Sequence, residues 1–251
     1  IGAVLIIIVL MLIQAGIYTV THLHRARHFI TYIPSALFLA ALTSAGDSIE
    51  STIYMGYWAW LFPLLLIVWG IGCYIATTIP YTYPPNRGLQ ALWINLMAMA
   101  AMFIGVALSN NADDVFHYRM KIENCLIHND YETAEATGAR AEATDCHLTM
   151  LRAYTLAREG KLAERLFTYS LAGSAEDLVP KPGGTSMLMY PTDSLYKFLG
   201  ARPLSTQDTK TYLQALLKTH KATEAVKDYI LCGYLIDRNI DAFATTLPHF
   251  Y

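Results

Sequence analysis

The sequence predicts an all-α protein made of two parts: four transmembrane helices within residues 1–112, and a domain of α-hairpin repeats over residues 113–251. The first observation is the distribution of charge. Residues 1–112 contain three basic and two acidic side chains, whereas the rest of the chain contains 15 basic and 18 acidic ones. Such a break in composition separates a membrane region from a water-soluble one. The second observation is that helical hairpins of common design recur in the soluble part.

The mixed, mildly acidic charge of that part argues against nucleic acid as a partner, because nucleic-acid binding needs a clustered basic face.

Four apolar stretches approach the about 20 residues that a helix needs to cross a bilayer. They are residues 1–20, 29–45, 58–79 and 88–109. The second is the shortest and contains Pro34, which a helix shielded by protein tolerates. The first has no basic region before it and no small-residue cleavage site after it, so it is not a signal peptide. Because the chain begins inside this apolar run, we expect further sequence before it.

The loops between these stretches predict the orientation of the chain. The first and third loops carry the basic side chains of the membrane part, namely Arg25, Arg27 and Arg87. The loop over residues 46–57 carries acidic side chains only. Positive charge marks the cytoplasmic side of a membrane protein. The three arginines therefore serve as topology markers, and they predict that residues 113–251 lie outside the cytoplasm.

The loop "THLHRARH" (residues 21–28) raises the question of a metal site. His24 and His28 are four residues apart, a spacing that suits two ligands on one helix face, and His22 is a third candidate. No nearby cysteine or carboxylate completes the set. We interpret the segment as a basic turn among lipid headgroups, and no metal or cofactor is predicted. Asp47 and Glu50, in the next loop, are interpreted as solvated side chains.

The soluble part contains three segments with the same helix–turn–helix pattern, residues 123–139, 153–169 and 232–250. Aligning Asp130 of the first with Lys161 of the second gives an offset of 31 residues, near the 34-residue period of tetratricopeptide repeats. Residues 212–230 resemble a fourth hairpin with a degenerate turn. Small residues let the paired helices approach and large ones fill the gaps, so the hairpins must stack to bury their apolar faces. The last hairpin lacks a polar capping helix, which predicts that further sequence follows.

An irregular insert over residues 178–203 interrupts the hairpins with several prolines and glycines. Its Gly183–Ser186 run resembles a phosphate-binding loop, but Lys181 precedes the glycines and the pattern is otherwise absent. A short helix is predicted over residues 194–199, with Thr192 at its start and Gly200 at its end. Because long loops often carry recognition, we expect the insert to project as a contact surface. The candidate contact residues are Lys181, Tyr190, Asp193, Tyr196 and Arg202.

Nucleophilic catalysis finds little support in the soluble part. Ser186 and Ser194 are not in the glycine-flanked elbow of a serine hydrolase, and the histidines are scattered among the hairpins. The repeat offset places Cys125 and Cys146 about 15 Å apart along a helix axis, too far for a disulfide. The cysteines are interpreted as small apolar core residues.

Three segments carry a resemblance to a known family: residues 134–173, "MLMYPTDSLYKFLGARP" (187–203) and "YILCGYLIDRNIDAFATTLPHFY" (229–251). They resemble an uncharacterised family of bacterial polytopic membrane proteins (a domain of unknown function) with a C-terminal helical-repeat domain. The resemblance implies the inner membrane of a bacterium, and that this chain is a fragment of a longer protein. It carries no catalytic residue. Two hypotheses follow: an envelope scaffold whose outer repeats bind a protein or peptide, or the C-terminal part of a multi-span enzyme such as a glycosyltransferase using a lipid-linked sugar.

Overall fold

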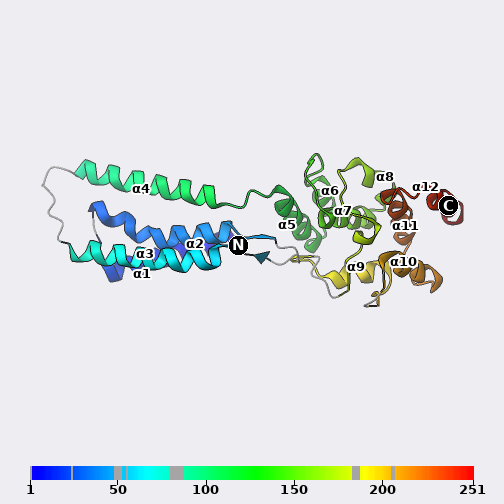
Figure 1. The fold of residues 1–251 in the computed structure, drawn as a ribbon, viewed down its shortest axis with the longest axis horizontal. Coiled ribbons are helices and arrows are strands. Elements are labelled where there is room, and N and C mark those ends of the chain that lie inside the picture. The colour runs from blue at the N-terminus through cyan, green and yellow to red at the C-terminus, as the bar shows by residue number, and fades with distance from the viewer. Residues whose placement is uncertain are drawn as a thin grey trace. The chain divides into compact units, whose positions relative to one another are not determined.

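The computed structural model describes residues 2–23, 25–47, 53–54, 56–79, 88–182, 187–204 and 207–251. These residues are mostly helical, with one pair of two-residue strands, β1 (Gly46–Asp47) and β2 (Ile53–Tyr54). The all-α prediction is therefore confirmed. The chain divides into two compact units (Figure 1). The membrane unit is Ile1–Gly46 with Tyr54–Ala112, and the hairpin unit is Asp47–Ile53 with Asp113–Tyr251.

Three helices of the membrane unit are long and apolar enough to cross a bilayer: α1 (Gly2–Thr21), α3 (Trp58–Thr78) and α4 (Gly88–Ser109). They agree with the first, third and fourth predicted spans. Most of their large apolar side chains are exposed, and in lipid such side chains contact hydrocarbon at no cost. The protein is therefore membrane-associated by its composition and helix lengths.

The second predicted span, residues 29–45, is not one long α-helix. It consists of an eight-residue 3-10 helix, η1 (Arg25–Tyr32), followed by an 11-residue α-helix, α2 (Ile33–Thr43). Pro34 lies in the first turn of α2 and explains the change. Proline has no N–H, and its ring clashes with the carbonyl four residues earlier, so regular α-helix does not extend back through it.

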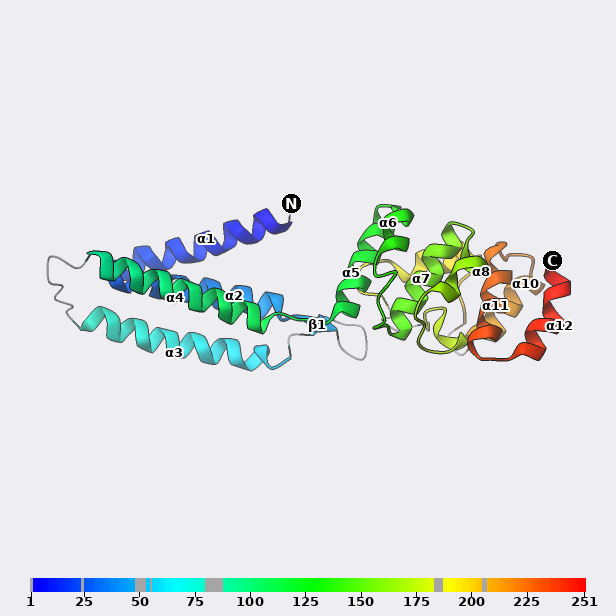
Figure 2. The ribbon, with the colours of Figure 1, turned by 90° about the horizontal axis from the view of Figure 1, so that it is seen from above.

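The η1–α2 segment is the central element of the membrane unit. η1 packs against α1 and α4, and α2 packs against α1, α3 and α4. Figures 1 and 2 show these helices side by side in both views. Ala40 and Ala41 are buried with Trp58 of α3 in a small core. Small side chains of this kind let helices approach closely in a membrane protein.

The hairpin unit is formed by shorter helices. They are α5 (Asp114–Ile127), α6 (Tyr131–Ala136), α7 (Cys146–Arg158), α8 (Leu162–Arg165), η2 (Leu166–Thr168), η3 (Ala175–Asp177), α9 (Thr192–Leu199), α10 (Thr209–Lys218), α11 (Ala225–Ile236) and α12 (Ile240–Phe250). One continuous core runs through the unit, and its fully buried members include Leu148, Tyr154 and Tyr229.

A helix–turn–helix occurs at each of the three positions predicted from the sequence, joining α5 to α6, α7 to α8 and α11 to α12. The turns share one geometry. Each contains a residue with positive φ: Asn129 (56°), Gly160 (70°) and Arg238 (57°). The N–H of the following residue then donates to the carbonyl five residues back, at 2.9, 2.9 and 2.8 Å respectively. This is the long-range bond of the Schellman motif, which satisfies carbonyls at a helix C-terminus.

Consecutive hairpins stack through their helices. α6 packs against α7, and α8 packs against α11. The helix that ends one hairpin therefore contacts the helix that begins the next, as expected for an array in which no hairpin buries its apolar face alone. The array is irregular, because α8 has only four residues before the chain turns into the 3-10 helix η2.

The insert does not project as a loop over its described residues. Its helix α9 starts at Thr192, two residues earlier than predicted, and buries Leu195, Tyr196 and Leu199 in the core. Gly200 ends it at a φ of 132°, and a Cβ there would lie 2.0 Å from the backbone oxygen of Lys221, so glycine is required. The Gly183–Ser186 run, which the sequence did not support as a phosphate-binding loop, lies outside the described residues.

Candidate functional site

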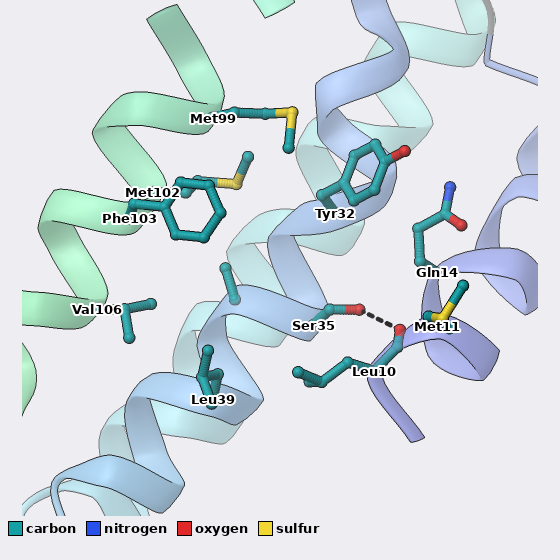
Figure 3. Close-up of a pocket in the computed structure, with 11 residues that line it drawn as sticks. Leu10, Met11, Gln14, Tyr32, Ser35, Leu39, Met99, Met102, Phe103 and Val106 are labelled. Carbon is teal, nitrogen blue, oxygen red and sulfur yellow. Dashed lines mark hydrogen bonds between the residues drawn. The ribbon is translucent and has the colours of Figure 1, made fainter. Parts of the chain in front are cut away.

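The membrane unit contains a cavity of about 300 Å³ between α1, the η1–α2 segment and α4 (Figure 3). Its walls are mainly apolar and rich in methionine. The lining residues are Leu10, Met11, Gln14, Tyr32, Ser35, Ala36, Leu39, Met99, Met102, Phe103 and Val106. The volume falls at the lower end of the range for small-molecule sites. Methionine is flexible and polarisable, so such walls adapt to the shape of an apolar ligand.

Three polar side chains interrupt these walls. The Ser35 hydroxyl donates to the Leu10 carbonyl at 3.0 Å (Figure 3). The Gln14 amide donates weakly to the Thr31 hydroxyl, at 3.4 Å. The Tyr32 hydroxyl has no hydrogen-bond partner among the described residues, and it points into the same space as the Gln14 amide (Figure 3). The cavity therefore offers a phenol donor and an amide, and its described lining residues include no charged group.

The wall formed by η1 is held by side chains from the other helices. The Phe29 N–H donates to the Asn95 Oδ1 on α4 at 2.9 Å, and the Trp69 Nε1–H on α3 donates to the Ile30 carbonyl, also at 2.9 Å. Ile30 is four residues before Pro34, so its carbonyl is the one that the proline cannot serve as an α-helical donor. Backbone groups at membrane depth must find partners within the protein, and Trp69 replaces the missing donor.

We expect Trp69→Phe to lower the free energy of unfolding of the membrane unit by about 1 kcal/mol, the scale of a hydrogen bond between membrane helices. In a Pro34→Ala background this loss should fall toward zero, because alanine at that position has a backbone N–H that can serve the Ile30 carbonyl. The measurement is reversible unfolding in mixed micelles, followed by circular dichroism. It is made on the unchanged full chain, on each single variant and on the double variant. Trp93→Phe on the exposed side of α4 is the matched control. Equal losses in both backgrounds would contradict the pairing of Trp69 with Pro34.

Arg27, which was predicted as a topology marker, also makes hydrogen bonds that hold the end of a neighbouring helix. Its guanidinium donates to the carbonyls of Ala76 and Ile79, the latter at 2.8 Å. These are unpaired carbonyls at the C-terminus of α3, where positive charge is also favoured by the helix dipole. The Arg25 side chain, Arg87 and His24 lie outside the described parts of the chain, as do the Asp47 side chain and Glu50.

The remaining histidines of the first loop show no metal-binding geometry. The His28 ring makes edge contacts with the rings of Tyr18 and Tyr32, at centroid distances of 5.4 and 5.3 Å. Among the described residues, no three histidine, cysteine or acidic side chains are grouped closely enough to hold a metal ion.

The five predicted contact residues do not form one surface. Tyr196 is buried, and its hydroxyl donates to the Pro180 carbonyl at 2.7 Å, so its prediction as a contact residue is wrong. Tyr190 is half-buried, and its hydroxyl lies 3.0 Å from that of Tyr154. Lys181 is exposed, and Arg202 and Asp193 form an exposed ion pair at 3.7 Å. Such a pair contributes little to stability or binding.

One thiol of the hairpin unit is placed beside an imidazole and a carboxylate. Cys146 lies 3.7 Å from the His147 Nδ1, which in turn lies 3.8 Å from the Asp145 carboxylate. Burial, followed by the nearby Asp177 and Asp145 carboxylates, raises the pKa of the thiol. A nucleophilic cysteine needs a lowered pKa, so this arrangement does not activate the sulfur. All four cysteines are described, and all are unpaired.

A cluster of charges joins the first two hairpins. Lys161 contacts the carboxylates of Glu135 and Glu159 at 3.1 and 3.2 Å, and Arg165 pairs with Glu135. Burial alone would raise the pKa of Glu135, but hydrogen bonds from Glu159 and Lys161 and the nearby positive charges lower it. Burial and the hydrogen bond to Glu135 raise the pKa of Glu159. The cluster links two helices of the stack, which gives it a structural role.

Sequence reasoning missed three buried charged residues, Glu123, Arg119 and Arg152, all at most 3% exposed. It also missed Tyr32 and Trp69 in the membrane unit. The strongly polar side chains of the predicted spans are Gln14, Gln90 and Asn95, and Gln14 and Asn95 were the available signal for the cavity. Comparison with protein families, curated proteins and solved structures finds no match. The resemblance to a bacterial membrane-protein family therefore stays a prediction.

Proposed function

We propose that this protein is a membrane-anchored scaffold of the bacterial envelope whose stacked hairpins bind a helix of another protein. The observation that carries the proposal is an uncovered apolar stripe on α12. Ile240, Ala244 and Leu247 are exposed and lie at i, i+4 and i+7, which places them on one helix face. Ile240 is 67% exposed, and Leu247 is 37% exposed.

The stacking order supports a helix as the occupant of this stripe. Earlier in the array, the last helix of each hairpin is covered by the first helix of the next. α12 occupies the same place in its own hairpin, and its apolar stripe is exposed. An amphipathic helix from a partner protein would continue the stack and bury the stripe in the same way. We treat the stack as tetratricopeptide-like on this basis. No feature of the described residues favours the alternative of a lipid-linked-sugar enzyme.

A photoreactive residue in place of Leu247 tests the binding face, in the full chain and in native membranes. We expect a specific adduct that the added change Ile240→Asp abolishes. The same photoreactive residue at Leu204, which is 70% exposed but outside α12, is the matched control and should give no adduct. Equal adducts at both positions, or an adduct that survives Ile240→Asp, would contradict the proposal. An adduct between two copies of this chain would show that the stripe binds a second copy and not another protein.

We infer further that the η1–α2 segment makes a fourth crossing. Phe29 contacts Asn95, and the N–H of Asn111 donates to the Thr43 carbonyl at 2.9 Å. Asn95 is 14 residues, about 21 Å, from the end of α4 at Ser109, and Asn111 lies two residues beyond that end. Eight 3-10 residues and 11 α-helical residues together extend about 32 Å, similar to the thickness of the hydrocarbon core. With four crossings and the arginine-containing loops in the cytoplasm, the hairpin unit lies outside it.

Thiol labelling tests this topology. Cys125 is buried, so an exposed position is needed, and Lys197→Cys on α9 supplies one. A membrane-impermeant maleimide should label this variant in intact spheroplasts, above the level of the unchanged chain. Labelling that appears only after lysis would place the hairpin unit in the cytoplasm and would contradict both the topology and an outer partner.

A further inference from the structure

We infer that the cavity of the membrane unit binds an uncharged lipid whose ring carries carbonyl oxygens, the chemistry of an isoprenoid quinone. Met99 and Met102 on α4 face Gln14 on α1 and Tyr32, the last residue of η1, across this space (Figure 3). The inference concerns a ligand within the bilayer, and it does not depend on the partner helix proposed above.

The polar groups of the cavity select the class of ligand. The Tyr32 hydroxyl is a hydrogen-bond donor without a described partner, and the Gln14 amide is engaged only through a long bond of 3.4 Å. Both can donate to a carbonyl oxygen. Among the described residues, no lysine, arginine or histidine lines the cavity. A phosphate or carboxylate would be left without a counter-charge in an apolar environment, which is costly, so the ligand is uncharged.

The depth of Gln14 and Tyr32 in the bilayer narrows the class of ligand further. Gln14 is seven residues from the end of α1 at Thr21, about 10 Å, and Tyr32 is 11 residues from the end of α2 at Thr43, about 16 Å. Both therefore lie well inside a hydrocarbon core of about 30 Å. The ester carbonyls of bilayer glycerolipids lie at the edge of that core and do not reach this depth. A ring that carries carbonyl oxygens on a hydrocarbon chain can reach the depth of Gln14 and Tyr32.

The walls suit such a ring. Met11, Met99 and Met102 present thioethers, and Phe103 presents an aromatic face. Sulfur atoms contact aromatic rings favourably, often at the ring edge, and stacking on Phe103 adds to this. α1 and α4 lie on opposite sides of α2 (Figure 3), and we expect a ligand to enter between these helices from the bilayer.

Binding of decylubiquinone to the full chain in detergent tests the inference. Decylbenzene, which has the same chain on a ring without carbonyls, is the matched probe. We expect saturable binding of the quinone, seen as a rise in the unfolding midpoint, with decylbenzene at least about tenfold weaker. Tyr32→Phe removes only the hydroxyl and should weaken quinone binding by about three- to tenfold, without affecting decylbenzene.

Two further variants keep the test decisive. Ala36→Phe fills the cavity and should abolish binding of both probes. Tyr74→Phe changes the same atom on the exposed side of α3 and should have no effect. The inference is overturned if the quinone shows no saturable binding. It is also overturned if both probes bind alike and Tyr32→Phe changes neither, since the cavity would then accept any hydrocarbon. Should Tyr32→Phe fail to fold, the comparison of the two probes on the unchanged chain and on Ala36→Phe still separates quinone binding from general uptake of hydrocarbon.

Discussion

Replacing Glu123 with glutamine should lower the free energy of unfolding of the hairpin unit by about 3 kcal/mol. The Glu123 carboxylate is fully buried on α5. It accepts hydrogen bonds from three consecutive backbone N–H groups, those of Leu188, Met189 and Tyr190, at 3.1, 2.5 and 2.9 Å. Glutamine has the same shape but replaces one acceptor oxygen by an NH₂ group. At least one buried N–H then faces another donor, and the negative charge that strengthens the other bonds is lost.

Hydrogen exchange of the α5 and α7 amides in the full chain, together with urea titration read by pulse proteolysis, measures this loss within the hairpin unit. Glu132→Gln makes the same chemical change at an exposed position on α6 and should stay within about 0.5 kcal/mol of the unchanged chain. The exchange of residues 188–190 should rise most, since these amides lose their acceptor directly. Equal stabilities of the two variants would show that Glu123 does not hold the insert.

Local sequence signals were sufficient for the hairpins. The turns at Asn129, Gly160 and Arg238 were located from polar residues between amphipathic stretches, and each has the same capping geometry. Such turns depend on residues within one helical turn of each other, so a single sequence carries their information. The same holds for α9 and its end at Gly200, where the helix and its terminating glycine were both predicted.

Long-range contacts account for what the sequence did not reveal. The insert resembles an exposed loop by its prolines and glycines, but the acceptor for its backbone N–H groups is Glu123, at least 65 residues earlier in the chain. In the membrane unit, Pro34 was expected to be tolerated within the second span, but the α-helix begins only at Ile33. The sequence alone could not predict that Trp69, on another helix, donates a hydrogen bond to the Ile30 carbonyl. Both cases pair a backbone group with one distant side chain, and periodicity contains no information on such pairs.

In the candidate site, too, some residues could be identified from the sequence and others could not. Gln14 and Asn95 were noticeable because polar residues are rare in spans, and the structure places both beside the η1–α2 segment. Tyr32 was not noticeable, because tyrosine near the end of a predicted span is typical of an interfacial residue. The interruption at Pro34 moves it inward, to the start of a shorter α-helix. Tyr32 therefore lies inside the membrane unit because α2 begins directly after it, at Ile33.

Arg152→Lys should lower the free energy of unfolding of the hairpin unit by about 2–3 kcal/mol, although the charge is kept. The Arg152 guanidinium is buried on α7 and donates to the carbonyls of Gly138 and Ser170, at 2.8 and 2.9 Å. It also lies over the ring of Tyr169, 5.1 Å from the centroid. Burial lowers the pKa of the guanidinium, which still stays charged at neutral pH because the ordinary pKa of arginine is about 12 or higher.

The planar fork of Arg152 reaches two loops at once, the one between α6 and α7 and the one after η2. A lysine ammonium is a single point on a flexible stem, so it can serve one of these carbonyls but not both, and it loses the stacking on Tyr169. Arg140→Lys, the same change at an exposed position, is the control, and urea titration of the full chain read by pulse proteolysis is the measurement. If Arg152→Lys matches the unchanged chain within about 0.5 kcal/mol, the buried charge alone, and not the geometry of the fork, holds the two loops.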